Sequence, residues 1–284
     1  MPTVQANDID IYYEEHGSGE PLLLIMGWGG NAASWSPQIP GLAETFRIIA
    51  FDNRGAGRTT APESPYSITQ MADDTVALLD LLDIQRAHVF GVSMGGMIAQ
   101  ELAIEHPDRV DTLILGCTTP GSCHAAGVAR LHNDISSFRD SNGQGSLEWL
   151  GDFLRRLWTE DAMTKSTAEL QDFVLSLIRF PPTSHGLHFQ ADAVLEHDTY
   201  DRLEQIRSRT LVMTGDEDTL IDPKNSAILA ERIPNAELQT FEGLRHAFHL
   251  ERPDLANKAI IEFILGTRLE AKADPPLELS ERRR

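Results

Sequence analysis

Five short apolar runs recur along this chain, and segments with helical spacing of apolar residues lie between several of them. The runs cover residues 22–26, 48–51, 87–90, 112–115 and 210–213. Runs of this length that are apolar on both faces are typical of parallel strands covered by helices on each side. The helical spacing spans residues 69–82, 95–106 and 224–232. The alternation predicts an α/β fold with a mostly parallel, doubly wound sheet.

The same pattern predicts how the chain is divided. Alternating residues over 4–13 predict an antiparallel edge strand before the first buried run. The strand pattern stops over residues 118–205, where aromatic residues recur at largely helical spacing. We therefore expect a core domain of residues 1–117 and 206–266, with residues 118–205 inserted as a helical lid over the sheet. The charged segment 267–284 is expected to be a flexible tail.

The charge balance disfavours two classes of partner. The sequence has 24 Lys and Arg against 43 Asp and Glu, a formal net charge of −19. A surface this negative repels phosphate backbones and anionic headgroups, so neither nucleic acid nor a membrane surface is expected as a partner. The same repulsion should favour neutral substrates over anionic ones. Whether the chain forms a homo-oligomer is left open by the sequence.

The cysteine content and the pattern of apolar residues both bear on the cellular compartment. The two cysteines, Cys117 and Cys123, are too few for a disulfide framework or a four-cysteine zinc site, and they fit a reducing cytoplasm. No positive segment followed by an apolar stretch opens the sequence, and no apolar run reaches the roughly 18 residues of a membrane span. We expect a cytoplasmic protein.

The strongest local motif is a G-x-S-x-G sequence centred on Ser93, over residues 91–95. It stands directly after the predicted strand 87–90 and before the helical segment 96–106. A serine on a sharp strand-to-helix turn is lifted above the carboxyl ends of the strands, where α/β folds bind ligands. The helix that follows directs its free N–H groups toward the same point, where an oxyanion can develop.

A serine hydroxyl needs a nearby base and a third group that orients the base. On this type of fold the chain order is serine, acid, histidine. Asp218 closes a G-x-x-D loop after the strand 210–213, and His246 follows the predicted last strand, 236–241. Both loops lie at the edge of the sheet where Ser93 emerges. The residues themselves leave rivals for these two positions: Asp216, Asp222 and His249.

These motifs together resemble the α/β-hydrolase superfamily, in particular its lid-bearing esterases, lactonases and C–C hydrolases. The similar segments are residues 22–30, 51–57, 91–95, 215–218, and 243–246 with 251–253. The resemblance implies that Ser93 is the nucleophile, His246 the general base and then acid, and Asp218 the orienting carboxylate. It covers the chain to about residue 263, with the lid unmatched.

The resemblance also implies an oxyanion hole formed by the backbone N–H groups of Met94 and Trp28. The family usually has His-Gly before the second donor, whereas this chain has Met26-Gly27. The missing histidine removes a side chain that often buttresses the loop, but the backbone N–H remains. The Met-Gly pair is closest to aclacinomycin methylesterase-like and enol-lactonase relatives. Trp28 is also expected to bind substrate, together with Trp149 and Trp158 of the lid.

We therefore expect a serine hydrolase of the carboxylesterase type, which acts on a small-molecule ester or lactone through an acyl-enzyme without a cofactor or metal. His185 and His188 have no companion carboxylate at helical spacing and are not expected to bind a metal. Three other functions remain open: a lactonase or C–C bond hydrolase of ring-cleavage products, a cofactor-free peroxidase or perhydrolase, and a non-catalytic ligand receptor.

Overall fold

The computed structural model describes residues 3–121, 124–127 and 147–266, apart from the side chains of residues 147–149. Within them, eight strands form one sheet in the order β1-β2-β4-β3-β5-β6-β7-β8. Strand β2 is antiparallel to β1 and β4. The other six strands, β3 to β8, are parallel to one another. The strands are β1 (Thr3–Ala6), β2 (Ile9–His16), β3 (Pro21–Ile25), β4 (Arg47–Phe51), β5 (Ala87–Val92), β6 (Val110–Gly116), β7 (Arg209–Gly215) and β8 (Ala236–Phe241).

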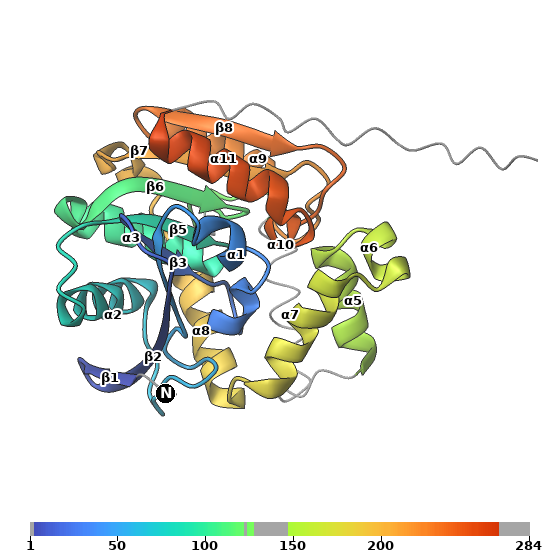
Figure 1. Ribbon diagram of the computed structural model, residues 1–284, viewed down its shortest axis with the longest axis horizontal. Coiled ribbons are helices and arrows are strands. Elements are labelled where there is room, and N and C mark those ends of the chain that lie inside the picture. The colour runs from blue at the N-terminus through green and yellow to red at the C-terminus, as the bar shows by residue number, and fades with distance from the viewer. Residues whose placement is uncertain (1–2, 122–123, 128–146, 267–284) are drawn as a thin grey trace, which may run out of the picture.

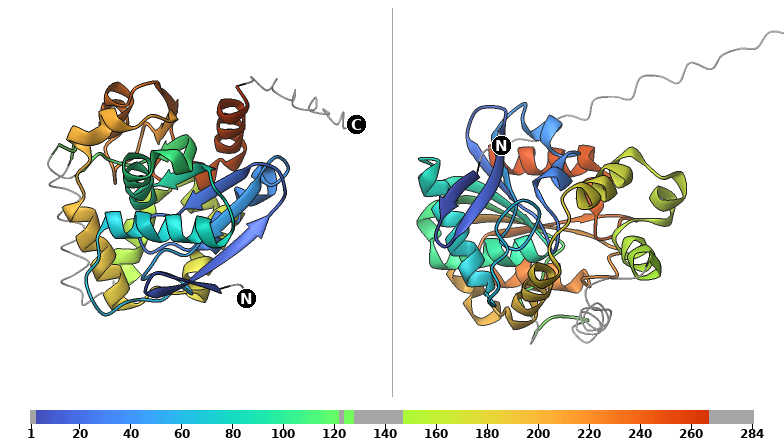
Figure 2. Two further views of the ribbon diagram at one scale, coloured as in Figure 1. Left: turned by 90° about the vertical axis from the view of Figure 1, so that its left-hand side faces the viewer. Right: turned by 90° about the horizontal axis from the view of Figure 1, so that it is seen from below.

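Helices cover both faces of this sheet (Figures 1 and 2). One apolar cluster packs α2, α3 and α9 against the strands, and a second packs η1, α1, α10 and α11 against the opposite face. The bounds are η1 (Ala32–Trp35), α1 (Ile39–Leu42), α2 (Ile68–Leu81), α3 (Met94–Glu105), η2 (Pro107–Arg109), α9 (Lys224–Arg232), α10 (Phe248–Glu251) and α11 (Pro253–Leu265). The predicted α/β fold with a mostly parallel, doubly wound sheet is confirmed.

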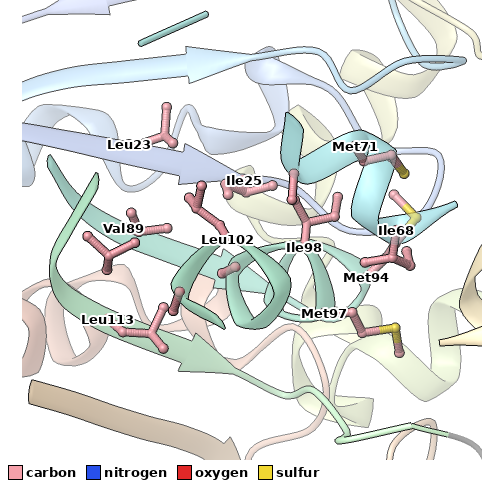
Figure 3. Close-up of a cluster of buried hydrophobic side chains, with 14 of the residues drawn as sticks. Leu23, Ile25, Ile68, Met71, Val89, Met94, Met97, Ile98, Leu102 and Leu113 are labelled. Carbon is pink, nitrogen blue, oxygen red and sulfur yellow. The ribbon is translucent and has the colours of Figure 1, made fainter. Parts of the chain in front are cut away.

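Helix α3, which begins directly after Ser93, is held firmly by its packing against the two central strands. Figure 3 shows Met94, Ile98 and Leu102 of α3 beside Ile25 and Val89 of the two central strands. All five side chains are buried. Burial of such a side chain contributes roughly 1.5–3 kcal/mol, so the start of α3 has little freedom to move relative to β3 and β5.

The remaining helices lie between β6 and β7 in the chain. They are α5 (Leu147–Leu157), α6 (Glu160–Lys165), α7 (Ala168–Arg179) and α8 (Ser184–Glu196), and η3 (Tyr200–Gln205) follows them. In Figure 1, α5, α6 and α7 gather at the right of the molecule, while α8 runs past the central strands. Thr167 and Thr183 begin α7 and α8, because each side-chain oxygen accepts a backbone N–H of the first turn. The boundaries 118 and 205 of the lid stay a prediction.

The structure differs from the sequence prediction at the amino-terminal end. One strand was expected over residues 4–13, but the chain forms a hairpin of β1 and β2. Asn7 turns the chain with a φ of 53°, a left-handed conformation that asparagine tolerates better than most residues. The predicted tail, 267–284, lies outside the described residues. No helix in the described ranges is long and apolar enough to cross a membrane.

Candidate active site

Ser93 stands on a strained turn between β5 and α3. Its φ of 55° and ψ of −121° place a non-glycine residue in a conformation that is rarely occupied. The flanking glycines make the turn possible, because a Cβ on Gly91 would collide with the carbonyl oxygen of Gly95, and one on Gly95 with that of Ile25. The backbone N–H of Ser93 donates to the carbonyl of Gly116 at 2.9 Å, which ties the turn to β6.

The turn places the serine at the start of a helix. Met94 is the first residue of α3, and the first N–H groups of a helix have no acceptor within it. Ser93 itself is half-buried and lines a cavity. The local sequence therefore presents a hydroxyl to a cavity beside the positive end of a helix dipole.

Asp218 and His246 meet at the carboxyl ends of β7 and β8. Asp218 Oδ2 lies 2.7 Å from His246 Nδ1, and both side chains are buried. The other carboxylate oxygen accepts the backbone N–H groups of Leu220 and Ile221 at 2.8 and 3.0 Å. These bonds fix the carboxylate, which in turn orients the imidazole so that Nε2 is the nitrogen available for proton transfer.

The electrostatics of this pair follow from burial and charge. Burial lowers the pKa of His246, but the charge of Asp218, its hydrogen bond and the contact with Cys117 together outweigh the effect of burial. The net pKa of His246 is therefore raised well above its ordinary value of 6.5. Burial and the neighbouring His246 lower the pKa of His249 to about 3, so His249 is neutral at pH 7.

The rivals for the triad positions have other partners. Asp216 accepts the N–H of Gly243 at 2.7 Å, and Asp222 accepts that of Lys224 at 2.9 Å, at the start of α9. His249 is buried among aromatic rings and also lines the cavity. The structure thus pairs Asp218 with His246 and gives Asp216, Asp222 and His249 other neighbours.

The cavity that Ser93 and His246 share has a volume of about 460 Å³, within the range of small-molecule sites. Side chains from the core, from α5, α7 and α8, and from the loop after Asp218 form its walls. Most of them are apolar, and Asp152 and Arg156 add one charge of each sign. The apolar lining includes Met26, Trp28, Val92, Met97, Phe153, Leu157, Phe173, Leu177, Leu187, Val194, Leu220 and Leu250.

The loop after β3 lies directly beside Ser93. A Cβ on Gly27 would be 3.1 Å from the Cβ of Ser93. Gly30 donates its N–H to the carbonyl of Gly27 at 3.1 Å, and Gly29 has a φ of 69°. A turn with this φ at its third residue favours glycine. Trp28, the second residue of the turn, lines the same cavity as Ser93.

A serine on a strand-turn-helix, a buried carboxylate-histidine pair and a glycine-rich loop beside the serine, all on one mostly parallel sheet, are features of one family. The model of the α/β hydrolase fold matches residues 20–253. The chain belongs to the α/β-hydrolase fold family.

Individual α/β hydrolases are similar over nearly the whole chain. A protein of Azorhizobium caulinodans named carbamate hydrolase RutD is 32% identical, over 93% of this chain and 98% of its own. The solved structure of Est816, titled an N-acyl homoserine lactone degrading enzyme, has a TM-score of 0.80 and 30% identity, over 92% of this chain and 100% of its own. The enol-lactonase from Burkholderia xenovorans LB400 has a TM-score of 0.83 and 25% identity, over 93% and 100%.

The three tryptophans expected to bind substrate in this α/β hydrolase have different places. Trp28 lines the cavity, and its ring meets that of Phe153 edge-on at 6.2 Å between centroids. Trp158 requires a correction, because it is fully buried beyond the end of α5, where it packs against Phe173 and does not line the cavity. The side chain of Trp149 lies outside the described residues.

Sequence reasoning did not identify several wall residues of this α/β hydrolase. Leu177 lies one turn after Phe173 on α7, and Leu187, Ala191 and Val194 form one stripe of α8. Their helical spacing was a usable signal for a buried face. That spacing does not tell whether the face meets the core or a cavity.

The described residues contain no group of three His, Cys, Asp or Glu side chains that could hold a metal ion. His185, one of the two histidines on α8 considered for such a role, lies with Nε2 3.0 Å from the carbonyl of Ala61. Cys117 is buried and lines the cavity. Cys123 lies outside the described residues.

Proposed function

We propose that this α/β hydrolase cleaves carboxylic esters with an apolar acyl group through an acyl-enzyme on Ser93. The observation that carries the proposal is the 2.7 Å bond between Asp218 and His246 at the wall of the apolar cavity that Ser93 also lines. A positioned base and its orienting acid are what a serine hydroxyl needs to become a nucleophile at neutral pH.

In the first half of the reaction, the Oγ of Ser93 attacks the ester carbonyl carbon while its proton passes to Nε2 of His246. The carbonyl oxygen becomes an oxyanion, which the backbone N–H groups of Met94 and Trp28 bind. Removal of one such donor typically costs about 3–4 kcal/mol of barrier. When the intermediate collapses, His246 gives the proton to the departing alcohol, and the acyl group stays on Ser93.

In the second half, His246 takes a proton from water, and the resulting hydroxide attacks the acyl carbonyl. Collapse of this intermediate releases the carboxylic acid, and the proton returns from His246 to Oγ of Ser93. Asp218 stabilises the imidazolium in each half. The apolar walls exclude water from the acyl chain, and burial stabilises the complex by about 0.8 kcal/mol for each CH₂ group.

Lactones are the second candidate substrates, because a lactone is an ester whose alcohol stays attached to the acyl group. The likeness to Est816 and to the enol-lactonase supports this candidate. The same attack and proton transfers apply, and only the fate of the alcohol differs. The likeness to RutD adds carbamates, in which the carbonyl carbon bears a nitrogen, as a class to be compared.

A hydrolysis panel tests the proposal. Purified protein is assayed with p-nitrophenyl esters of two to twelve acyl carbons, with γ-lactones, with N-acyl homoserine lactones and with carbamates, with Ser93→Ala as the control. We expect the highest kcat/KM on esters or lactones with a medium to long acyl chain, and none of this activity in Ser93→Ala. Turnover of carbamates alone, or of none of these classes, would reject the proposal.

A further inference from the structure

The turn that carries Trp28 is held by the lid helix α8 through two hydrogen bonds. The indole Nε1 of Trp28 donates to the carbonyl of Leu187 at 2.9 Å, and the backbone N–H of Gly29 donates to Oε1 of Gln190 at 2.9 Å. Gln190 is fully buried, and its Nε2 donates to the carbonyl of Arg54 at 2.8 Å. The amide oxygen and the amide nitrogen of Gln190 are therefore both hydrogen-bonded, and they connect the turn to the loop after β4.

Helix α8 is also fixed to the core independently of Gln190. A Cβ on Gly186 would collide with the carbonyl oxygen of Gly55, so the two backbones are in direct contact. The hydroxyl of Tyr66 lies 3.1 Å from the carbonyl of Gly186 and 3.2 Å from that of Arg54. These contacts hold α8, and with it the backbone of Gln190, in a fixed position relative to the core.

The bond to Gln190 selects one orientation of the peptide between Trp28 and Gly29. Rotation of that peptide would turn its N–H away and direct the carbonyl oxygen of Trp28 toward Oε1 of Gln190. Two acceptors would then face each other in a buried place, which leaves both unsatisfied. The positive φ of Gly29 belongs to the orientation that the bond favours.

We propose that Gln190 is a positioning residue for the oxyanion hole. By holding the N–H of Gly29, it keeps the turn in the conformation that presents the backbone N–H of Trp28 to the oxyanion beside Ser93. It supplies from the lid a support that the Met26-Gly27 sequence lacks. This role rests on the proposed function, since it presumes that Ser93 is the nucleophile.

The test compares Gln190→Met, which keeps the length of the side chain but removes the acceptor, with the wild type. The readouts are kcat and KM for a p-nitrophenyl ester, and the rate at which a fluorophosphonate labels Ser93. Loss of one oxyanion-hole donor lowers kcat by about 10²–10³-fold. A donor that is still present but less well oriented should therefore lower kcat by about 10–100-fold. We expect that loss in kcat and in the labelling rate, with KM changed by less than about threefold because the donor acts in the transition state.

Tyr66→Phe is the matched control, because it removes hydrogen bonds between α8 and the core without touching the turn. Its melting temperature should fall, while kcat and the labelling rate stay within about threefold of the wild type. Equal losses of kcat in Gln190→Met and Tyr66→Phe would overturn the proposal, as would a Gln190→Met variant with wild-type kcat.

Gln190→Glu covers the case in which Gln190→Met does not fold. It keeps an oxygen for the N–H of Gly29 and loses the bond to Arg54, so it should label Ser93 within about threefold of the wild-type rate despite a lower melting temperature. A tenfold or larger loss in folded Gln190→Glu would overturn the proposal. Failure of the proposed substrate class is seen separately, since the wild type would then label with the fluorophosphonate but hydrolyse no ester or lactone.

Discussion

The carboxylate of Asp218 lies 2.7 Å from Nδ1 of His246, although the two residues are 28 positions apart in the chain. Strands β7 and β8 are parallel neighbours, so the loops that follow them meet at one edge of the sheet. Two backbone N–H groups fix the carboxylate from the other side. The imidazole is therefore oriented by the fold before any substrate binds.

The first prediction concerns this orientation. Asp218→Asn keeps the size of the side chain but removes the charge and the preference for one imidazole tautomer. In the serine protease triad the equivalent change lowers kcat about 10⁴-fold, and we expect a loss of at least 10³-fold here. Asp216→Asn, two residues away, is the control and should stay within about threefold of the wild type. The measurement is kcat on the best ester of the panel, and equal losses in both variants would contradict the assignment.

The second prediction is a pH dependence. His246 must be neutral to accept the proton of Ser93, and its pKa is raised well above 6.5 because Asp218 and Cys117 together outweigh the effect of burial. Activity should therefore rise with pH as His246 loses its proton, with the midpoint of the acid limb of kcat/KM above 6.5. In Asp218→Asn the residual activity should have its midpoint at lower pH. A midpoint that does not move would mean that another group controls the acid limb.

The third prediction concerns the acyl group. Leu177 lines the cavity from α7, whereas Ile178 on the same helix is 70% exposed. Leu177→Trp should narrow the cavity and lower kcat/KM for esters of eight or more acyl carbons about tenfold, with less than a threefold effect on acetyl esters. Ile178→Trp serves as the control and should leave both unchanged. A uniform loss for all chain lengths would show that the acyl chain does not bind along α7.

The fourth prediction follows from the net charge of −19. A negative surface lowers the local concentration of anions, so a neutral ester should have a higher kcat/KM than a matched ester with a carboxylate at low salt. The difference should shrink as salt is added, because screening shortens the range of the repulsion to about 3 Å at 1 M. Faster turnover of the anionic ester at low salt would contradict this account and would point to Arg156 in the cavity wall.

The position of Ser93 on a strand-to-helix turn could be predicted from sequence because its signal is local. Ser93 lies within five residues that contain both glycines of the turn, and the strand before it and the helix after it have clear patterns. Asp218 and His246 follow strands, and the parallel arrangement of β7 and β8 is enough to bring their loops to one edge. Residues that come directly after predicted strands could therefore be placed without side-chain detail.

The placement of side chains on helices α5 to α8 could not be predicted in the same way. Trp158 and Phe153 stand on or just after one helix, yet Phe153 lines the cavity and Trp158 is fully buried away from its lining. Their placement depends on how α5 and α7 pack, which periodicity does not define. The contact between Gln190 and Gly29 joins residues 161 positions apart. A single glutamine in a helix gives no sequence signal for such a contact.

The central claim is that Ser93 carries the acyl group, and trapping of that intermediate tests it most directly. The protein is mixed with a p-nitrophenyl ester, quenched in acid within the first turnover and examined by intact-mass and peptide mass spectrometry. We predict a burst of one nitrophenol per active site and one acyl group on the peptide that contains Ser93. Ser93→Ala should show neither, with a melting temperature close to that of the wild type. An acyl group on Cys117, or equal acylation of Ser93→Ala, would contradict the account.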